Sequence, residues 1–279
     1  MTTSKKIHSE QVTGKAPAKQ WGIVLGKILL LLIWVAATTI AAQLVVGYLM
    51  YWMLGKETFM QPVPTTIYSA LSYIVSLVWL IFATPKVIAN FNRLPKGKAK
   101  SHGKKTALHP MNRTDLGLRE TPTWTDIGLA PIGFIISTLL AGALVAIFNI
   151  FPWFNAEQAQ DVGFGPFLIG MDRVVAFIAL VVIAPIAEEL IFRGWLYSKL
   201  RTILNAKLAN TWSMVVSIFL VSLLFGIIHL QWNVGVNVFA LSVVLCGMRE
   251  ITGTIYAGML THMIKNGVAF YILYIYGMQ

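Results

Sequence analysis

Charged residues are scarce in this sequence of 279 amino acids: they make up 12% of it, whereas a soluble domain has about a quarter. Acidic residues are the rarer kind, with 11 Asp and Glu against 22 Lys and Arg. The single cysteine, Cys246, lies in an apolar run, which excludes an intrachain disulfide. Hydrophobic residues make up 57% of the chain, and the mean hydropathy is +0.70. This composition predicts a protein that crosses a membrane several times.

The net charge of +11 has two interpretations. A basic chain can bind nucleic acid, but here the basic residues lie in segments between apolar runs rather than on a soluble module. Orientation in a membrane explains them better, because cytoplasmic segments are rich in Lys and Arg. The segments expected outside contain only Lys56 as a basic residue. We therefore predict contact with membrane lipid, a cytoplasmic N-terminus and no nucleic-acid partner.

The apolar runs predict an all-α fold, a polytopic transmembrane helical bundle of about seven membrane segments. The expected segments are residues 28–54, 67–88, 127–151, 167–190, 212–228, 234–248 and 252–276. Residues 199–207 are expected to form a basic, amphipathic stretch at the membrane surface. The chain is expected to divide into a cytoplasmic basic arm (1–20), two N-terminal transmembrane helices (21–88), a basic cytoplasmic loop (89–125) and a transmembrane core (126–279).

Three charged residues follow the fourth apolar run: Glu188, Glu189 and Arg193. An ionisable group at membrane depth costs roughly 2.5 to 3.5 kcal/mol and marks a functional site by default. Glu189 and Arg193 are four residues apart and can pair on one helix face, which leaves Glu188 free on another. A helix that simply emerges at the membrane surface would also carry such residues.

Polar residues interrupt the apolar runs at two more places. His229 ends one run, four residues after Phe225, while His262 and Asn266 share one helix face in the last segment. Lys265 lies on a different face and is expected to reach an interface or a carboxylate. Each histidine alone could hydrogen-bond a neighbouring helix. Together with the acidic pair, these side chains predict one site.

The three groups follow the patterns EExxxR (Glu188, Glu189, Arg193), FxxxH (Phe225, His229) and HxxxN (His262, Asn266). In this order they resemble the motifs of the CAAX protease and bacteriocin-processing (CPBP) family of intramembrane proteases, also called the Abi family. The resemblance covers about residues 126–267, so residues 126–279 would form the catalytic core. It implies a peptide hydrolase in which Glu188 activates water with the help of His229. Glu189 and Arg193 would support this base, and His262 and Asn266 would bind the oxyanion.

The resemblance leaves the cofactor and the substrate open. Glu188, His229 and His262 could ligate zinc, but a glutamate-activated water without metal is equally consistent with the motifs. The substrate would be a membrane-associated peptide, either prenylated or pheromone-like, and the location a bacterial plasma membrane. Two other functions remain open at this stage. They are a non-proteolytic bacteriocin-immunity or scaffold protein of the same family, and a proton-coupled transporter.

Overall fold

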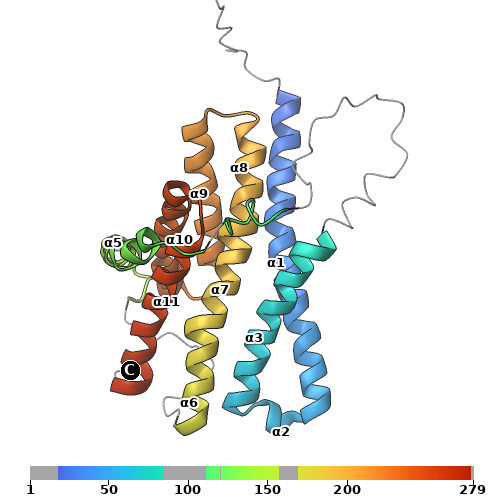
Figure 1. Cartoon of the computed structure of the whole chain (residues 1–279), viewed down its shortest axis with the longest axis vertical. Coiled ribbons are helices and arrows are strands. Elements are labelled where there is room, and N and C mark those ends of the chain that lie inside the picture. The colour runs from blue at the N-terminus through green and yellow to red at the C-terminus, as the bar shows by residue number, and fades with distance from the viewer. Residues whose placement is uncertain (1–17, 85–110, 120, 157–168, 278–279) are drawn as a thin grey trace, which may run out of the picture.

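The structure, a computed structural model, describes residues 18–84, 111–119, 121–156 and 169–277. Every regular element within these ranges is a helix, so the all-α prediction is confirmed (Figure 1). Most of the basic arm expected at residues 1–20, and most of the basic loop expected at residues 89–125, lie outside the described residues.

Two helices form a hairpin at the beginning of the described chain. They are α1 (Ala18–Leu54) and α3 (Pro62–Val78), with the short α2 (Lys56–Phe59) in the turn and η1 (Trp79–Ala83) continuing α3. Gly55 has a φ of 75°, which a glycine adopts easily, and lets the chain leave α1. The two helices pack on each other, and the hydroxyls of Thr39 and Ser76 lie 3.3 Å apart. Each helix begins earlier in the chain than the hydropathy pattern predicts.

A continuous helix of 36 residues runs from Gly170 to Asn205. Its parts are α6 (Gly170–Phe177), η2 (Ile178–Ile183), α7 (Ala184–Glu189), η3 (Leu190–Leu196) and α8 (Tyr197–Asn205). We call it the central rod. It is about 54 Å long, whereas a hydrocarbon core is about 30 Å thick. The helix therefore continues for four more turns beyond residue 190, where the fourth membrane segment was expected to end.

Residues 199–207 belong to the bundle, and their expected position at the membrane surface stays a prediction. Up to Asn205 these residues continue the central rod and pack against α1 and α9 (Asn210–Ile227). Lys199 is only 4% exposed, and Arg201 binds Glu250 of α10 (Trp232–Thr252) with 2.8 Å between Nε and Oε1. A hydropathy pattern ends a membrane helix at such charges because it contains no information about their partners.

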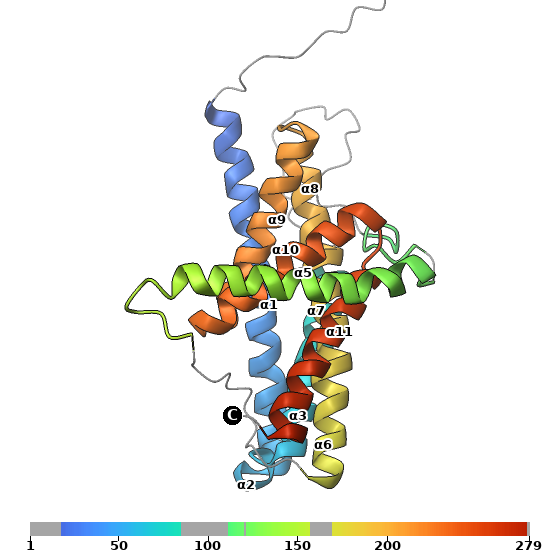
Figure 2. The ribbon, with the colours of Figure 1, turned by 90° about the vertical axis from the view of Figure 1, so that its left-hand side faces the viewer.

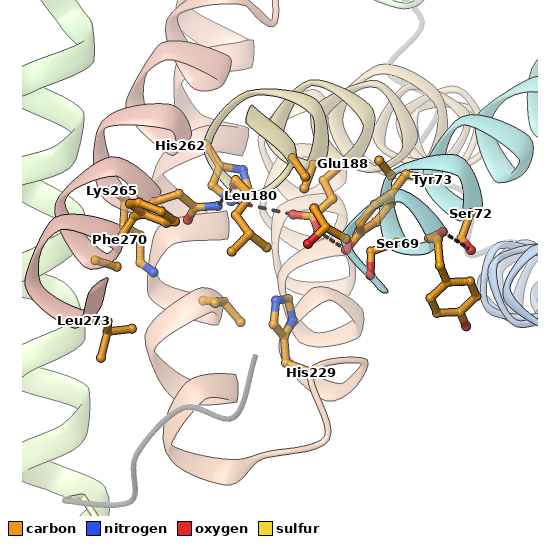
Figure 3. A pocket seen from close by; sticks show the side chains of 18 of the residues that line it. Ser69, Ser72, Tyr73, Leu180, Glu188, His229, His262, Lys265, Phe270 and Leu273 are labelled. Carbon is orange, nitrogen blue, oxygen red and sulfur yellow. Dashed lines mark hydrogen bonds and ion pairs between the residues drawn. The ribbon is translucent and has the colours of Figure 1, made fainter. Parts of the chain in front are cut away.

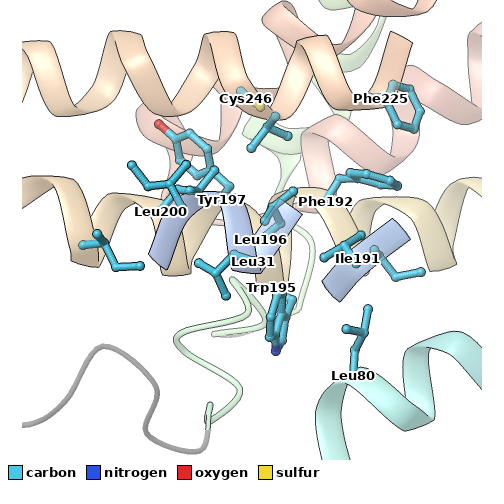
Figure 4. Packing of buried hydrophobic residues seen from close by; sticks show 14 of the residues in the cluster. Leu31, Leu80, Ile191, Phe192, Trp195, Leu196, Tyr197, Leu200, Phe225 and Cys246 are labelled. Carbon is cyan, nitrogen blue, oxygen red and sulfur yellow. The ribbon is translucent and has the colours of Figure 1, made fainter. Parts of the chain in front are cut away.

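The largest buried apolar cluster surrounds the second half of the rod (Figure 4). Ile191, Phe192 and Leu196 of η3 are at most 3% exposed. Figure 4 shows Leu31 and Leu80 on one side of them and Phe225 and Cys246 on the other. The N-terminal hairpin and the C-terminal helices therefore share one core with the rod between them.

α9 and α10 form a second hairpin, which returns along the rod. Residues 228–231 break the helix, and Leu230 has a φ of 57°, a left-handed conformation that is uncommon for leucine. Gly226 and Gly235 allow the two helices to approach closely, because a Cβ on Gly226 would lie 2.8 Å from the carbonyl oxygen of Gly235. This close crossing fixes the position of His229, which lies in the break.

The remaining helices are α5 (Trp124–Phe148) and α11 (Tyr256–Tyr271), which continues as η4 (Ile272–Tyr276). Figure 2 shows α5 lying across the bundle, at a large angle to the central rod and α1. It packs along α10 and α11, and the hydroxyl of Thr261 donates to the carbonyl oxygen of Ala130 over 3.1 Å. The sequence correctly places a helix here, but its crosswise direction was not expected.

Six of the described helices are long and apolar enough to cross a membrane. They are residues 21–54, 62–82, 124–148, 170–205, 210–227 and 232–252. The helix formed by α11 and η4 is not among these six, although a seventh segment is expected there. The protein is thus an all-α, integral membrane protein, while the count of seven segments and the cytoplasmic N-terminus stay predictions.

Candidate active site

The central rod carries the acidic pair near the middle of its length. Glu188 and Glu189 end α7, and Arg193 lies in η3. The exposed fractions are 7% for Glu188 and 0% for both Glu189 and Arg193. The alternative of a helix that surfaces from the membrane at these residues does not fit, because all three side chains are buried in the bundle.

Glu189 and Arg193 form the pair expected from their spacing. Nη1 of Arg193 donates to Oε1 of Glu189 over 2.8 Å. The guanidinium also lies over the ring of Phe225, 4.6 Å from its centroid, which is a favourable position for a cation. Neither residue of the pair lines the cavity described below. The pair is therefore a dry support behind the site rather than a part of its surface.

His262 lies between the two carboxylates. Its Nδ1 is 3.0 Å from Oε1 of Glu189, and its Nε2 is 3.6 Å from Oε2 of Glu188. A carboxylate can only accept, so Nδ1 donates to Glu189 and the ring orientation is fixed. His262 is 3% exposed and belongs to α11, so the first and last parts of the matching motifs meet across two helices.

His229 reaches the same depth because of the lengths of two helices. The rod extends 17 residues, or about 26 Å, from Glu188 to its end at Asn205. After the turn, α9 runs in the opposite direction over the same distance, 17 residues from Asn210 to Ile227. The break after α9 therefore returns to the level of Glu188. Nδ1 of His229 lies 2.7 Å from the carbonyl oxygen of Phe225, to which it must donate, so Nε2 keeps its lone pair.

Asn266 lies one turn after His262 on α11. Its Nδ2 donates to the carbonyl oxygen of Leu180 in η2 over 2.9 Å. An amide nitrogen has two N–H groups, so one donor and the amide oxygen are left for a ligand. The bond to the rod fixes the direction in which that remaining donor points.

A cavity of about 300 Å³ connects these side chains (Figure 3). Glu188, His229, His262 and Asn266 all line it, and Figure 3 shows the two histidines and Glu188 pointing toward one another. The structure thus brings together four of the six residues expected in the site, with Glu189 and Arg193 directly behind them.

Lys265 also lines the cavity, on a different helix face from His262. Its contact with an interface or a carboxylate stays a prediction. Glu188 is not the free carboxylate that its spacing suggests. Its Oε2 lies 3.6 Å from Nε2 of His262, and its Oε1 accepts a hydrogen bond from the hydroxyl of Tyr73 over 2.5 Å.

Sequence reasoning missed Tyr73 and the rest of this wall. The side chains come from α1 and α3, within the residues that the motifs do not cover: Thr39, Gln43, Thr66, Ser69, Ser72 and Tyr73. A signal was present, because Thr66, Ser69, Tyr73 and Ser76 recur at intervals of three and four in an apolar helix. Such a polar stripe on a membrane helix indicates a wet surface rather than a lipid-facing one.

The residues suggested as zinc ligands were Glu188, His229 and His262. Their chemistry suits zinc, and each histidine donates through Nδ1 to a second group, as metal-bound histidines commonly do. However, among the described residues no three His, Cys, Asp or Glu side chains are close enough together to hold one ion. The arrangement therefore does not fit a metal site, and the chemistry below uses side chains and water alone.

Comparison with protein-family models gives a match in the C-terminal part of the chain. Residues 170–268 match the family model described as type II CAAX prenyl endopeptidase, Rce1-like. A search of curated proteins and a search of solved structures gave no match. The matched segment begins with the central rod and ends just after Asn266, so it contains all three motifs. Over residues 170–268 the chain is similar to Rce1-like CAAX endopeptidases, and this match confirms the resemblance to the CAAX protease and bacteriocin-processing family over that segment.

Proposed function

We propose that this protein is an intramembrane endopeptidase, which hydrolyses a peptide bond in a membrane-associated or lipidated peptide by a water that Glu188 activates. The single observation behind this proposal is the cavity in which Glu188 meets two histidines and an asparagine amide at the depth of the bundle centre. The match to an endopeptidase family supports the reaction class.

The reaction needs a base, an oxyanion donor and a proton for the leaving amine. In the proposed mechanism Glu188 takes a proton from the water as its oxygen attacks the scissile carbonyl carbon. Nε2 of His229 accepts the second O–H of the water and orients it. The tetrahedral oxyanion then accepts hydrogen bonds from Nε2–H of His262, which requires this ring to be protonated on both nitrogens, and from the free N–H of Asn266. When the C–N bond breaks, Glu188 gives its proton to the leaving nitrogen.

A second cavity supports a lipidated substrate. It has a volume of about 470 Å³ and lies beside the break after α9, and its walls are almost entirely apolar. Its lining includes Phe148, Phe219, Leu230 and Trp232, and Leu230 directly follows His229. A hydrocarbon chain in this second cavity would hold the attached peptide near Glu188. We propose a prenylated or pheromone-like peptide as the substrate and a bacterial plasma membrane as the location.

The test is cleavage by the purified protein in proteoliposomes. A fluorogenic peptide with a farnesylated cysteine near its C-terminus is compared with the same peptide without the lipid. We expect Glu188→Gln to lower kcat by about 10²- to 10⁴-fold, the range of a general base. Glu57→Gln, a matched change at an exposed position in α2, serves as the control.

The outcomes separate the functions left open by the sequence. Full activity of a well-folded Glu188→Gln protein would show that the mechanism is wrong. If the wild-type protein cleaves neither peptide, nor any peptide secreted by its host, the immunity or scaffold function is favoured instead. A proton flux that depends on Glu188 without any cleavage would favour a transporter.

A further inference from the structure

Tyr73 is a residue of the site that lies outside the family motifs. It lies on α3, 115 positions before Glu188 and outside the matched segment 170–268. Its hydroxyl donates to Oε1 of Glu188 over 2.5 Å, which is within the range of a charge-assisted O–H···O⁻ bond. The carboxylate proposed as the base is therefore held by a helix of the N-terminal hairpin.

A partly buried tyrosine generally needs some partner for its hydroxyl, so the contact alone could be incidental. The neighbouring hydroxyls on α3 provide a comparison, because they find hydrogen-bond partners within their own helix. Thr66, Ser69 and Ser72 each donate to a backbone carbonyl four residues earlier in their own helix. Tyr73 instead donates across the cavity to another helix, and Figure 3 shows its ring directed at Glu188.

The geometry gives each oxygen of Glu188 its own neighbour. Oε1 accepts from Tyr73, and Oε2 faces Nε2 of His262 at 3.6 Å. The two neighbours come from opposite sides, so they fix the plane of the carboxylate. Each carboxylate oxygen has about two lone pairs, which leaves room for a water on the same oxygen. Without Tyr73, the side chain of Glu188 could rotate about its last bond.

We propose that Tyr73 is a positioning residue for the reaction: its hydroxyl orients the carboxylate of Glu188 toward the attacking water. This inference rests on the proposed function. It also makes α3 a wall of the active site, so that the N-terminal hairpin, which the family match does not cover, is required for catalysis and not only for insertion into the membrane.

The test compares Tyr73→Phe with Tyr48→Phe in the full-length protein, in the proteoliposome assay described above. Tyr48 is the control for the loss of a tyrosine hydroxyl, because it lies on α1 of the same hairpin, is 71% exposed and is not among the residues that line the cavity. Losing a hydrogen bond to a charged group corresponds to a fall of about 10- to 100-fold. We expect kcat of Tyr73→Phe to fall by this factor with KM unchanged, and Tyr48→Phe to keep both constants.

Thermal unfolding of each variant shows whether the loss is merely structural. A melting temperature of Tyr73→Phe equal to that of the wild type, together with reduced kcat, supports the positioning role. Wild-type kcat in Tyr73→Phe would overturn it, and so would a higher kcat, since Tyr73 would then obstruct the site. A rise in KM alone would assign the hydroxyl to substrate binding and also overturn it. If instead the wild-type protein and Glu188→Gln are equally inactive, the proposed function itself fails.

Discussion

Removing one member of the buried Glu189 and Arg193 pair is expected to destabilise the protein strongly. Both side chains are 0% exposed, and their atoms are 2.8 Å apart. Arg193→Met keeps most of the volume but leaves the carboxylate of Glu189 buried with His262 as its neighbour. Breaking a buried pair in this way costs about 3 to 5 kcal/mol. Because His262 can still donate to Glu189, we expect the free energy of unfolding to fall by an amount near the lower end of this range, about 3 kcal/mol.

The double variant distinguishes a charge effect from a packing effect. Oε2 of Glu189 and both Nε and Nη2 of Arg193 have no hydrogen-bond partner among the described residues, so the pair does not recover all of its desolvation cost. Glu189→Gln with Arg193→Met removes both charges and keeps an acceptor for His262. We expect this double variant to lie within about 1 kcal/mol of the wild type, far from the sum of the single losses.

The free energy of unfolding is to be measured in detergent micelles by tryptophan fluorescence. Glu250→Gln is the control, since Glu250 pairs with Arg201 at the same 2.8 Å but the two side chains are 25% and 14% exposed. A more exposed pair contributes at most about 1 kcal/mol. The reasoning is refuted if Arg193→Met costs no more than this control, or if the two single losses add up in the double variant.

Three further predictions concern the cavity and its frame. Treatment with a chelator should leave peptide cleavage unchanged in the assay above, because no described cluster fits a metal ion; loss of activity that zinc restores would contradict this. Asn266→Ala should lower kcat by about 10²- to 10³-fold, the effect of losing one oxyanion donor, whereas an unchanged kcat would exclude that role. Gly226→Ala should lower the melting temperature and kcat together, because its Cβ would meet the carbonyl oxygen of Gly235 at 2.8 Å. Ala substitution of Gly247, whose Cβ would meet nothing within 4 Å, is the control.

The sequence predicts the residues of the site better than it predicts the lengths and packing of the helices around the site. Glu188, His229 and His262 stand out because ionisable groups are costly in apolar runs, and this cost does not depend on knowing the fold. The depth of Glu188 was not predictable in the same way. Lys199 and Arg201 suggest that the rod ends near residue 190, and only tertiary contacts show that α8 buries the first and pairs the second.

Contacts between segments far apart in the sequence explain why neither the role of Tyr73 nor the direction of α5 was predicted. Tyr73 is separated from Glu188 by 115 positions, so no spacing within one helix can connect them. The polar stripe on α3 predicts that this helix faces a polar surface, but not which one. Likewise, the residues of α5 are apolar on all sides, so their pattern specifies a helix in an apolar environment without specifying its direction.

Glu188 and Glu189 are neighbours in the chain and yet have opposite environments. Glu189 is enclosed with Arg193 and does not line the cavity, so its charge is neutralised by a fixed partner. Glu188 lines a cavity whose far wall is formed by the polar side chains of α1 and α3. An isolated charge in hydrocarbon is costly, whereas a charge beside a polar cavity with room for water is tolerated there. Under the proposed mechanism, these different surroundings give the two carboxylates different roles: Glu189 is structural and Glu188 exchanges protons. In that mechanism the hydroxyls of the N-terminal hairpin make the cavity polar enough for a base at this depth.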